Sequence, residues 1–243
     1  MGGEKMNSQW QIDLFDGLQK AIDIQDVLDV SLKTVQPLGF EFCTFKTKFA
    51  LPLANRKTYV LGTNEDKVNQ KNSSGGYDEA PVTTHCSKTN VPAIWTGKNE
   101  GAIFEKDPAL VEEYFSWGHK GGWAQSVNEG GGQFSMFIVD SPEIMTQSYL
   151  ENDVNFNLEW ITIAVHSVIN RIRNATPSKI QLSEREKEVL RWTGDGKTAD
   201  EIGLILNLSH STVNFHLRKA MFKLNAPNKT SAVVKAVYLN LLH

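Results

Sequence analysis

The stretch from Ser183 onward is divided into short segments by residues that begin and end helices. Ser183 with Glu186, and Thr198 with Glu201, have the spacing of capping boxes, in which two side chains satisfy backbone amides at a helix start. Breaks follow at 194–196 (Gly-Asp-Gly), 207–209 and 227–228 (Pro-Asn). This pattern predicts an all-α domain of four short helices. A tight turn between the second and third is the plan of a helix-turn-helix.

The third predicted helix has an apolar face and a polar face. The apolar face, which helical spacing directs toward a core, consists of Val213, Leu217, Met221 and Leu224. The polar face carries residue types that contact bases and phosphates, because arginine can bond bidentately to guanine. The residues predicted to contact DNA are Ser211, Thr212, Asn214, Arg218 and Lys219.

Charge is distributed unevenly along the chain. Residues 202–243 contain no Asp or Glu, although they contain five Lys and Arg. Residues 178–243 have a net charge of +4, whereas residues 1–177 have a net charge of −7. A basic stretch laid over helical apolar spacing is typical of a module that binds a polyanion, so we expect double-stranded DNA as the partner of the C-terminal domain.

The same stretch resembles a known family of DNA-binding domains. The run LSEREKEVLRWTGDGKTADEIGLILNLSHSTVNFHLRKAMFKLNAPNKTSAVVKAV, which starts at residue 182, is similar to the DNA-binding domain of LuxR-type transcription regulators. Family hallmarks fall on Glu186, Leu190 and Gly196, and STVNFH and APNKT resemble the quorum-sensing branch. The resemblance implies that the third helix reads bases through Asn214 and Arg218. It implies scaffold roles for the three hallmarks: a capping or salt-bridging acid, a core leucine and a turn glycine.

Length and composition favour a two-domain protein of the cytoplasm. The chain has 243 residues, 40% of them hydrophobic and 22% charged. It has no apolar run of the roughly 18 residues that a membrane span requires. Its start, MGGEKMNSQ, lacks the apolar segment of a signal peptide, and two cysteines do not make a disulfide framework. We expect no membrane partner.

The first 172 residues predict a mixed domain. Helices are expected over 10–22 and 27–35, after Pro108 and over 149–172; strands are expected near 40–45, 58–61, 123–127 and 134–139, with a glycine-rich hairpin turn at 129–132 and a long loop over 62–92. The fold class is therefore α+β: an N-terminal α/β/α sandwich with an antiparallel sheet, then the helical domain. The predicted domains are 1–172 and 182–243, joined by a linker at 173–181.

This N-terminal plan resembles the acyl-homoserine-lactone-binding domain of LuxR-type regulators. The strings LGFEFCTF, IWTG and SWGHKGGW occur in the family's order and spacing. The resemblance implies that Trp95, Pro81 and Gly122 line a ligand pocket, as the family's tryptophan, proline and glycine do. Tyr59, on a predicted strand, and Asp78 complete the predicted ligand site.

The loop before Pro81 departs from the family pattern. The family's Tyr-x-x-x-Trp-x-x-x-Tyr segment falls on Asn64, Val68 and Asn72, so all three aromatic residues are replaced. The family's aspartate, which bonds the ligand amide, falls on Ala80; Asp78 or Glu79 could take its place. Aromatic walls exclude water and a buried amide requires an acceptor, so we expect ordinary acyl-homoserine lactones to bind weakly.

The sequence predicts no catalytic residues, no metal site and no cofactor. His85 and Cys86 are adjacent, which is poor geometry for two ligands on one metal, and Cys43 lies in an aromatic run typical of a core. A response regulator would need a receiver of alternating strands and helices, which the opening helices do not supply. An enzyme with an appended DNA-binding module would need a catalytic motif.

The sequence therefore predicts a quorum-sensing-related transcription regulator, not an enzyme. Its N-terminal domain would sense a small-molecule autoinducer, either an acyl-homoserine lactone or an atypical ligand. We expect it to act as a homodimer on an inverted-repeat operator, because two-fold pairing lets two half-sites be read together. The alternative is a ligand-independent regulator, or an antagonist that forms heterodimers with a related regulator.

Overall fold

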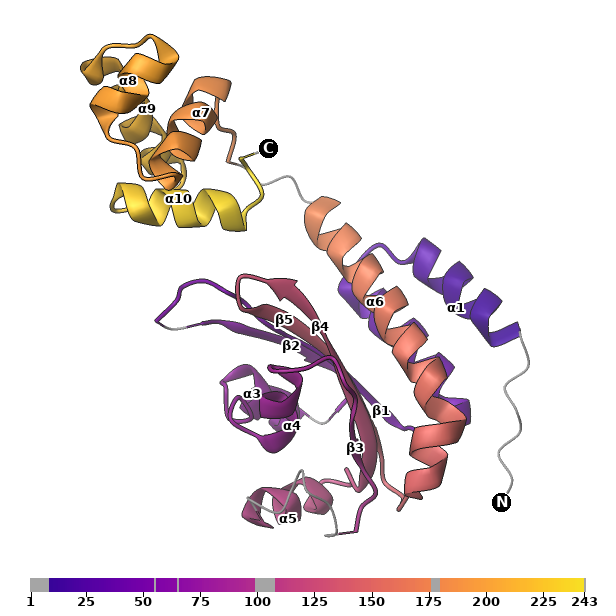
Figure 1. Cartoon of the computed structure of the whole chain (residues 1–243). Coiled ribbons are helices and arrows are strands. Elements are labelled where there is room, and N and C mark those ends of the chain that lie inside the picture. Colours follow the sequence, from indigo (N-terminus) through magenta and orange to yellow (C-terminus); the bar gives the residue numbers. More distant parts are fainter. Residues whose placement is uncertain (1–8, 55, 65, 99–107, 176–179, 243) are drawn as a thin grey trace. The chain divides into compact units, whose positions relative to one another are not determined.

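The computed structural model describes residues 9–54, 56–64, 66–98, 108–175 and 180–242 (Figure 1). The chain forms two compact units, Met1–Ala175 and Thr176–His243. Each unit has its own buried apolar core, so each is described by itself.

The N-terminal unit is built on a five-stranded antiparallel sheet. Its strands are β1 (Phe42–Lys48), β2 (Thr58–Gly62), β3 (Ala93–Trp95), β4 (Gly121–Gly130) and β5 (Gln133–Ser141), in the order β2-β1-β5-β4-β3. The hairpin between β4 and β5 turns through Gly130, Gly131 and Gly132, which all have positive φ, so the predicted hairpin turn is confirmed. Lys46 pairs with Met136 and Val60, and Asp140 pairs with Phe42 and Gly122.

Helices cover both faces of this sheet (Figure 1). On one face lie α1 (Gln9–Lys20), α2 (Ile24–Val35) and α6 (Asn155–Ala175), over a core that includes Phe45, Phe137 and Val139. On the other face lie α3 (Asp66–Ser73), α4 (Pro81–Cys86) and α5 (Pro108–Ser116). Since strand residues alternate between faces, Lys46, Met136 and Ile138 point toward this second layer. The predicted α/β/α sandwich is confirmed.

The predicted long loop over 62–92 is wrong. This stretch forms α3 and α4. The apolar signal of α3 is weak, because within its polar sequence only Val68 and Asn72, four residues apart, are buried. The six-residue α4 starts at Pro81, where a proline suits the first helical turn. Short polar helices that pack against a sheet through two residues leave little periodicity to detect.

The helix expected over 149–172 begins and ends differently. Its first six residues, Tyr149–Val154, form a wider π-helical turn before α6 begins. At the other end α6 continues to Ala175. Arg173 therefore belongs to the helix rather than to the predicted linker; its guanidinium donates a hydrogen bond to Thr47 and lies over the ring of Tyr59.

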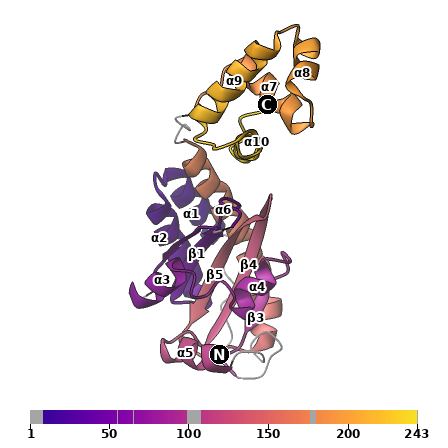
Figure 2. The same cartoon turned by 90° about the vertical axis from the view of Figure 1, so that its left-hand side faces the viewer.

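The C-terminal unit has the four predicted helices. They are α7 (Glu184–Gly194), α8 (Ala199–Leu206), α9 (His210–Lys223) and α10 (Lys229–Tyr238). Figure 2 shows α9 as the long helix of this unit, with α10 seen end-on. Both predicted capping boxes are present, at Ser183 with Glu186 and at Thr198 with Glu201. Val189, Leu190, Ile202, Val213 and Ala232 form the centre of the core.

The turn between α8 and α9 depends on a glycine that the sequence analysis did not single out. A Cβ on Gly203 would lie 2.7 Å from the carbonyl oxygen of Leu208. Asn207 takes the left-handed conformation at the end of α8, with φ of 53°. The chain can therefore reverse within three residues, and Ser209 then caps the start of α9.

Candidate DNA-binding surface and ligand cavity

The exposed face of α9 carries the predicted DNA-binding residues. Val213, Leu217 and Ala220 bury the opposite face of this helix. The side chains of Ser211, Arg218 and Lys219 are exposed, and those of Thr212 and Asn214 are half-buried. These five residues therefore form a polar stripe along α9, the second helix of the helix-turn-helix.

The N-terminal end of this stripe is organised by Ser209. Its hydroxyl accepts a hydrogen bond from the backbone amide of Thr212 at 3.1 Å, and it is bonded to the hydroxyls of Ser211 and Thr212. The Asn214 carboxamide donates to the carbonyl of His210. A capped helix start with exposed hydroxyls presents backbone N–H groups and a positive dipole end, which favour a phosphate oxygen.

Two of the five cations in the acid-free stretch have structural roles. The Lys223 ammonium bonds the carboxylate of Glu186 at 2.7 Å, and Lys235 donates to the carbonyls of Leu224 and Asn225. Glu186 is only 3% exposed, so this ion pair ties the start of α7 to the end of α9. Burial raises the pKa of Glu186, but the bonds from Lys223 and Ser183 outweigh it and hold the pKa below its usual range.

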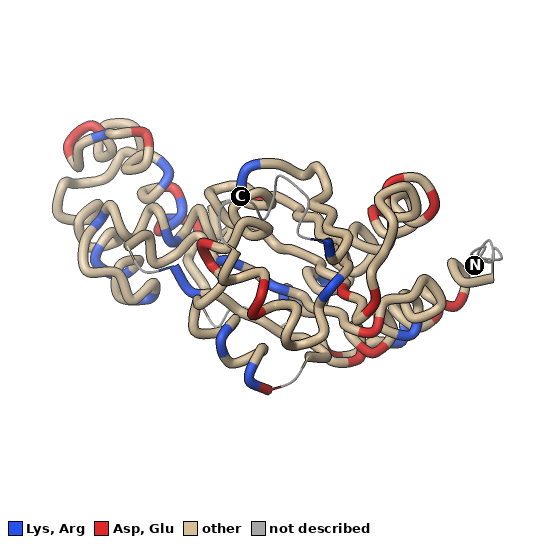
Figure 3. The backbone as a smooth tube through the Cα atoms, turned by 90° about the horizontal axis from the view of Figure 1, so that it is seen from below, with Lys and Arg blue, Asp and Glu red and all other residues tan. Residues whose placement is uncertain are grey.

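The remaining three cations are available to a polyanion. Within the described ranges, Arg218, Lys219 and Lys229 form no ion pair with a carboxylate. Figure 3 marks the Lys and Arg positions of the chain in blue and its Asp and Glu positions in red. Lys229 begins α10 beside a shallow groove that Ser211, Asn214 and Arg218 also line. The groove thus adds a cation from α10 to the polar stripe of α9.

Phe215 also lies on this surface, although it was not among the residues predicted from the sequence. Its ring is 47% exposed on the same side of α9, and the Lys219 ammonium lies 4.5 Å from the ring centre. A cation over an aromatic face is held in a narrower range of positions than a free lysine. The helical spacing of 215 from 211 and 218 was the signal that could have placed Phe215 here.

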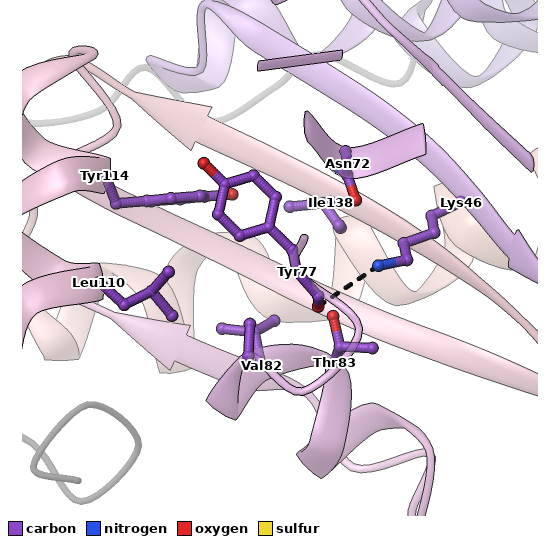
Figure 4. A pocket seen from close by; sticks show the side chains of 9 residues that line it. Lys46, Asn72, Tyr77, Val82, Thr83, Leu110, Tyr114 and Ile138 are labelled. Atoms are coloured by element: carbon purple, nitrogen blue, oxygen red, sulfur yellow. Dashed lines mark hydrogen bonds between the residues drawn. The ribbon is translucent and has the colours of Figure 1, made fainter. Parts of the chain in front are cut away.

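In the N-terminal unit, a small cavity lies between the sheet and the second helical layer (Figure 4). Its free volume is about 30 Å³. The lining residues come from β1, β5, α3, α4, α5 and the segment before α4: Lys46, Asn72, Tyr77, Ala80, Val82, Thr83, Leu110, Tyr114 and Ile138. Most small-molecule pockets are larger, about 300–1,000 Å³, so a ligand would have to displace lining side chains.

A buried lysine occupies one end of this cavity. The Lys46 side chain is 1% exposed, and its ammonium lies 3.0 Å from Asp78 Oδ1 and 3.4 Å from the carbonyl oxygen of Tyr77 (Figure 4). Lys48 approaches the other oxygen of Asp78 at 3.1 Å. Burial lowers the pKa of Lys46, and the nearby Asp78 carboxylate only partly opposes this effect. For Asp78, burial alone would raise the pKa, but the bonds from Lys46 and Lys48 are stronger and lower the pKa of Asp78 below its usual value.

A second buried pair lies on the same face of the sheet. His119 Nδ1 is 3.5 Å from Asp140 Oδ2, and both side chains are buried. Burial, together with the negative charge of Asp140, raises the pKa of Tyr114, whose ring lies 5.0 Å from that of His119. The face of the sheet that α3, α4 and α5 cover therefore carries buried charged residues. The alternation of apolar and polar residues in the sequence did not predict them.

The predicted ligand residues lie in different places around the cavity. Asp78 is the ion-pair partner of Lys46, and Pro81 starts the helix whose first turn lines the cavity. Trp95 and Gly122 are paired across β3 and β4, and a Cβ on Gly122 would lie 2.2 Å from the indole of Trp95. This close approach requires glycine at position 122. Both residues lie on the same face of the sheet as the cavity, but neither is among the residues that line it.

Tyr59, also predicted to contact the ligand, is not among the residues that line this cavity. It pairs with Thr47 in the register of β1 and β2, so it points to the opposite face from Lys46 and Val60. Its ring lies 5.7 Å from the guanidinium carbon of Arg173 in α6. A one-residue step along a strand reverses the face of a side chain, and the sequence alone did not fix the register of β2.

Neither cysteine has the surroundings of a nucleophile or a metal ligand. Both are buried; burial raises the pKa of Cys86 to about 12 and, with Asp140, raises that of Cys43. Among the described residues, no three His, Cys, Asp or Glu side chains are grouped closely enough to hold a metal ion. No described helix has the length and apolar character needed to cross a membrane.

A helix-turn-helix unit whose α9 contains no Asp or Glu follows an α/β/α unit with an internal cavity. This combination is typical of DNA-binding regulators that carry a sensor domain. Residues 180–236 match the model of the luxR family of bacterial regulatory proteins, and residues 23–169 match that of the autoinducer binding domain. The chain belongs to the LuxR-type transcription regulators that carry an autoinducer binding domain. The family and the class of function predicted from the sequence are confirmed.

Relatives match along nearly the whole chain. The transcriptional activator protein AnoR of Acinetobacter nosocomialis is 33% identical over 96% of this chain and 99% of its own. The quorum-sensing regulator RhlR of Pseudomonas aeruginosa is 28% identical, with 96% of each chain covered. The crystal structure of Escherichia coli SdiA has a TM-score of 0.82 at 21% identity, covering 97% of this chain and 98% of its own, which shows a shared fold.

Proposed function

We propose that this regulator binds an inverted-repeat operator as a homodimer, with α9 in the major groove. The observation that carries the proposal is the α9 stripe, in which Arg218 and Lys219 are exposed and have no carboxylate partner among the described residues. Arg218 and Asn214 would contact base edges, while Ser211, Thr212 and Lys219 would contact phosphates. Lys229 would add a phosphate contact from the start of α10.

Exposed apolar residues supply surfaces for the dimer. On α6, Phe156 and Ile163 are 73% and 62% exposed, and on α10 Val237 is 60% exposed. Large apolar side chains on a helix face are typical of an interface between subunits. Sedimentation equilibrium of the full chain should give a dimer, alone or on operator DNA; monomer under both conditions would exclude the proposal.

The N-terminal unit would act as a cytoplasmic small-molecule sensor without catalytic activity. The cavity lies between the sheet and the second helical layer, and its lining combines polar residues such as Lys46 and Asn72 with apolar ones such as Val82 and Leu110. An autoinducer such as an acyl-homoserine lactone, or an atypical ligand, would bind there. One SdiA structure with a TM-score of 0.82 is a complex with octanoyl-rac-glycerol, so at least one protein of this fold binds a small molecule.

One observation favours the alternative of a ligand-independent regulator, or of an antagonist that forms heterodimers. Lys46 lines the cavity, whose free volume is about 30 Å³, and its ammonium forms an ion pair with Asp78 at one end of that cavity. An internal ion pair could stabilise the domain in the way that a ligand does in a responsive regulator. Mass spectrometry of small molecules extracted from the purified protein separates the two: a stoichiometric compound supports the sensor, and operator binding by compound-free protein supports the alternative.

A further inference from the structure

We propose that the cavity selects a small carboxylate that also carries an amide N–H and a short hydrocarbon chain, as an N-acyl amino acid does. The carboxylate would bind Lys46, and the N–H would bind Asn72. This inference rests on the proposed sensing function of the N-terminal unit and names the ligand class of that site.

The charges at the polar end of the cavity favour an anion. Two ammonium groups, Lys46 and Lys48, share the single carboxylate of Asp78 at 3.0 and 3.1 Å. The Lys46 side chain is 1% exposed, and those of Lys48 and Asp78 are 20% and 17% exposed. Because an excess positive charge is costly away from water, a ligand carboxylate beside Lys46 would neutralise the group.

Lys46 also has hydrogen-bonding capacity left. An ammonium has three N–H donors, and the described residues offer it Asp78 Oδ1 and the more distant carbonyl of Tyr77 at 3.4 Å. A ligand oxygen can take the third donor and can replace the long bond to Tyr77. Charge-assisted bonds between ammonium and carboxylate are stronger than bonds to a neutral carbonyl, so a carboxylate is favoured over an ester.

Asn72 supplies a matching acceptor. Its side chain is 6% exposed and lines the cavity, and its Oδ1 atom has no hydrogen-bond partner within the described part of the chain. A buried acceptor without a partner is destabilising, so a ligand N–H would offset that cost. No Asp or Glu is among the cavity's lining residues, which favours a neutral amide N–H over a charged amine.

Apart from Thr83, the rest of the wall is mainly apolar and fits a hydrocarbon chain. Val82, Leu110 and Ile138 line the cavity, together with the aromatic rings of Tyr77 and Tyr114 (Figure 4). The free volume of about 30 Å³ is smaller than any such ligand, so binding must displace lining side chains. A short acyl chain requires the least displacement, which is why the inferred class is limited to small ligands.

Two compounds with the same acyl chain test the inference. N-butanoyl-homoserine lactone is neutral, whereas its ring-opened form, N-butanoyl-homoserine, has a carboxylate and keeps the amide. Calorimetric titration of the full-length protein should show at least tenfold tighter binding of the ring-opened compound. Equal or tighter binding of the lactone, or no binding of either compound at millimolar concentration, would overturn the ligand class.

Variants assign the contact to the two residues. Lys46→Met and Asn72→Leu should each weaken the ring-opened compound at least tenfold, while Lys57→Met, which removes an exposed lysine outside the cavity, should leave binding unchanged. Circular dichroism checks that each variant is folded, and the comparison of the two compounds on the unaltered protein does not depend on any variant. A gel shift on the same preparation shows separately whether the chain binds DNA.

Discussion

The two units of this regulator use basic side chains in opposite ways. On α9 of the helix-turn-helix, Arg218 and Lys219 are exposed, with no carboxylate partner among the described residues. In the N-terminal sheet, Lys46 is buried and bonded to Asp78. An exposed cation keeps its hydration, so it adds little free-energy cost to folding and can bind a large polyanion. A buried cation loses its hydration, so its stability depends on the groups that bond to it. This difference supports the proposal that the α9 stripe binds DNA and that the cavity binds a small ligand.

The largest effect that tests this contrast is expected for Asp78→Ala. Removing the shared carboxylate leaves the buried Lys46 without its ion-pair partner, which should lower the free energy of unfolding by about 3 kcal/mol. Urea denaturation of the full chain measures the change, provided that the two units are followed by separate probes. A loss under about 1 kcal/mol would mean that water, rather than Asp78, supports Lys46.

A double variant sharpens the same prediction. Lys46→Met with Asp78→Ala removes both charges, and replacing a buried ion pair by apolar side chains is often nearly neutral. The double variant should therefore recover most of the stability that Asp78→Ala loses. If the stability loss of the double variant equals the sum of the losses in Lys46→Met alone and Asp78→Ala alone, the two residues stabilise the sheet independently.

In the helix-turn-helix unit the corresponding test is Glu186→Ala. Its carboxylate is 3% exposed, accepts a bond from the backbone amide of Ser183 at 2.8 Å and pairs with Lys223. Loss of a cap contributes about 1 kcal/mol and loss of a charged hydrogen bond a similar amount, so we expect a total of about 2–3 kcal/mol. Glu188→Ala, which removes an exposed pair with Arg185, should change stability by under about 0.5 kcal/mol.

The effect of Glu186 should depend on pH. Its folded-state pKa lies below the usual value of 4.5, so its contribution is present above that pH and is lost as the pH falls through the lowered pKa. The stability difference between the wild type and Glu186→Ala should therefore shrink in acid. A difference that stays constant from pH 6 to about pH 3 would mean that the carboxylate acts by packing alone.

On the DNA side, Arg218→Ala and Lys219→Ala should differ in kind. Arg218→Ala should cost about 1–3 kcal/mol on the operator and relax base preference, because it removes a base contact. Lys219→Ala should weaken all duplexes about equally and reduce the salt dependence. Fluorescence anisotropy on operator and scrambled duplexes separates these outcomes; operator binding that is unchanged by Arg218→Ala would place the reading face elsewhere.

The smallest effect is expected for Phe215→Ala. Its ring holds the Lys219 ammonium at 4.5 Å, an exposed cation–π contact worth about 0.5–1 kcal/mol. Operator affinity should fall about two- to fivefold and the fall should disappear in a Lys219→Ala background. A loss of the same size in both backgrounds would show that Phe215 contacts DNA directly.

The sequence predicted the helix-turn-helix better than the sensor cavity, and the reason is physical. Capping boxes such as Ser183 with Glu186 act within a few residues, so local patterns locate them. The Lys46–Asp78 pair joins positions 32 residues apart on β1 and before α4, and it depends on strand register. Register also places Tyr59 on the face opposite to Lys46, which the sequence did not show, and the polar sequence of α3 gave little sign of a helix.

Selection of DNA from a random duplex pool by the full-length protein tests the central claim most directly. Two copies of α9 should enrich an inverted repeat whose half-sites lie about one helical turn, or 10–10.5 base pairs, apart. The same selection with Arg218→Ala should yield a weaker or altered repeat. A pool without any enriched sequence, or with an unpaired half-site alone, would contradict the assignment of this chain as a dimeric operator-binding regulator that reads DNA through α9.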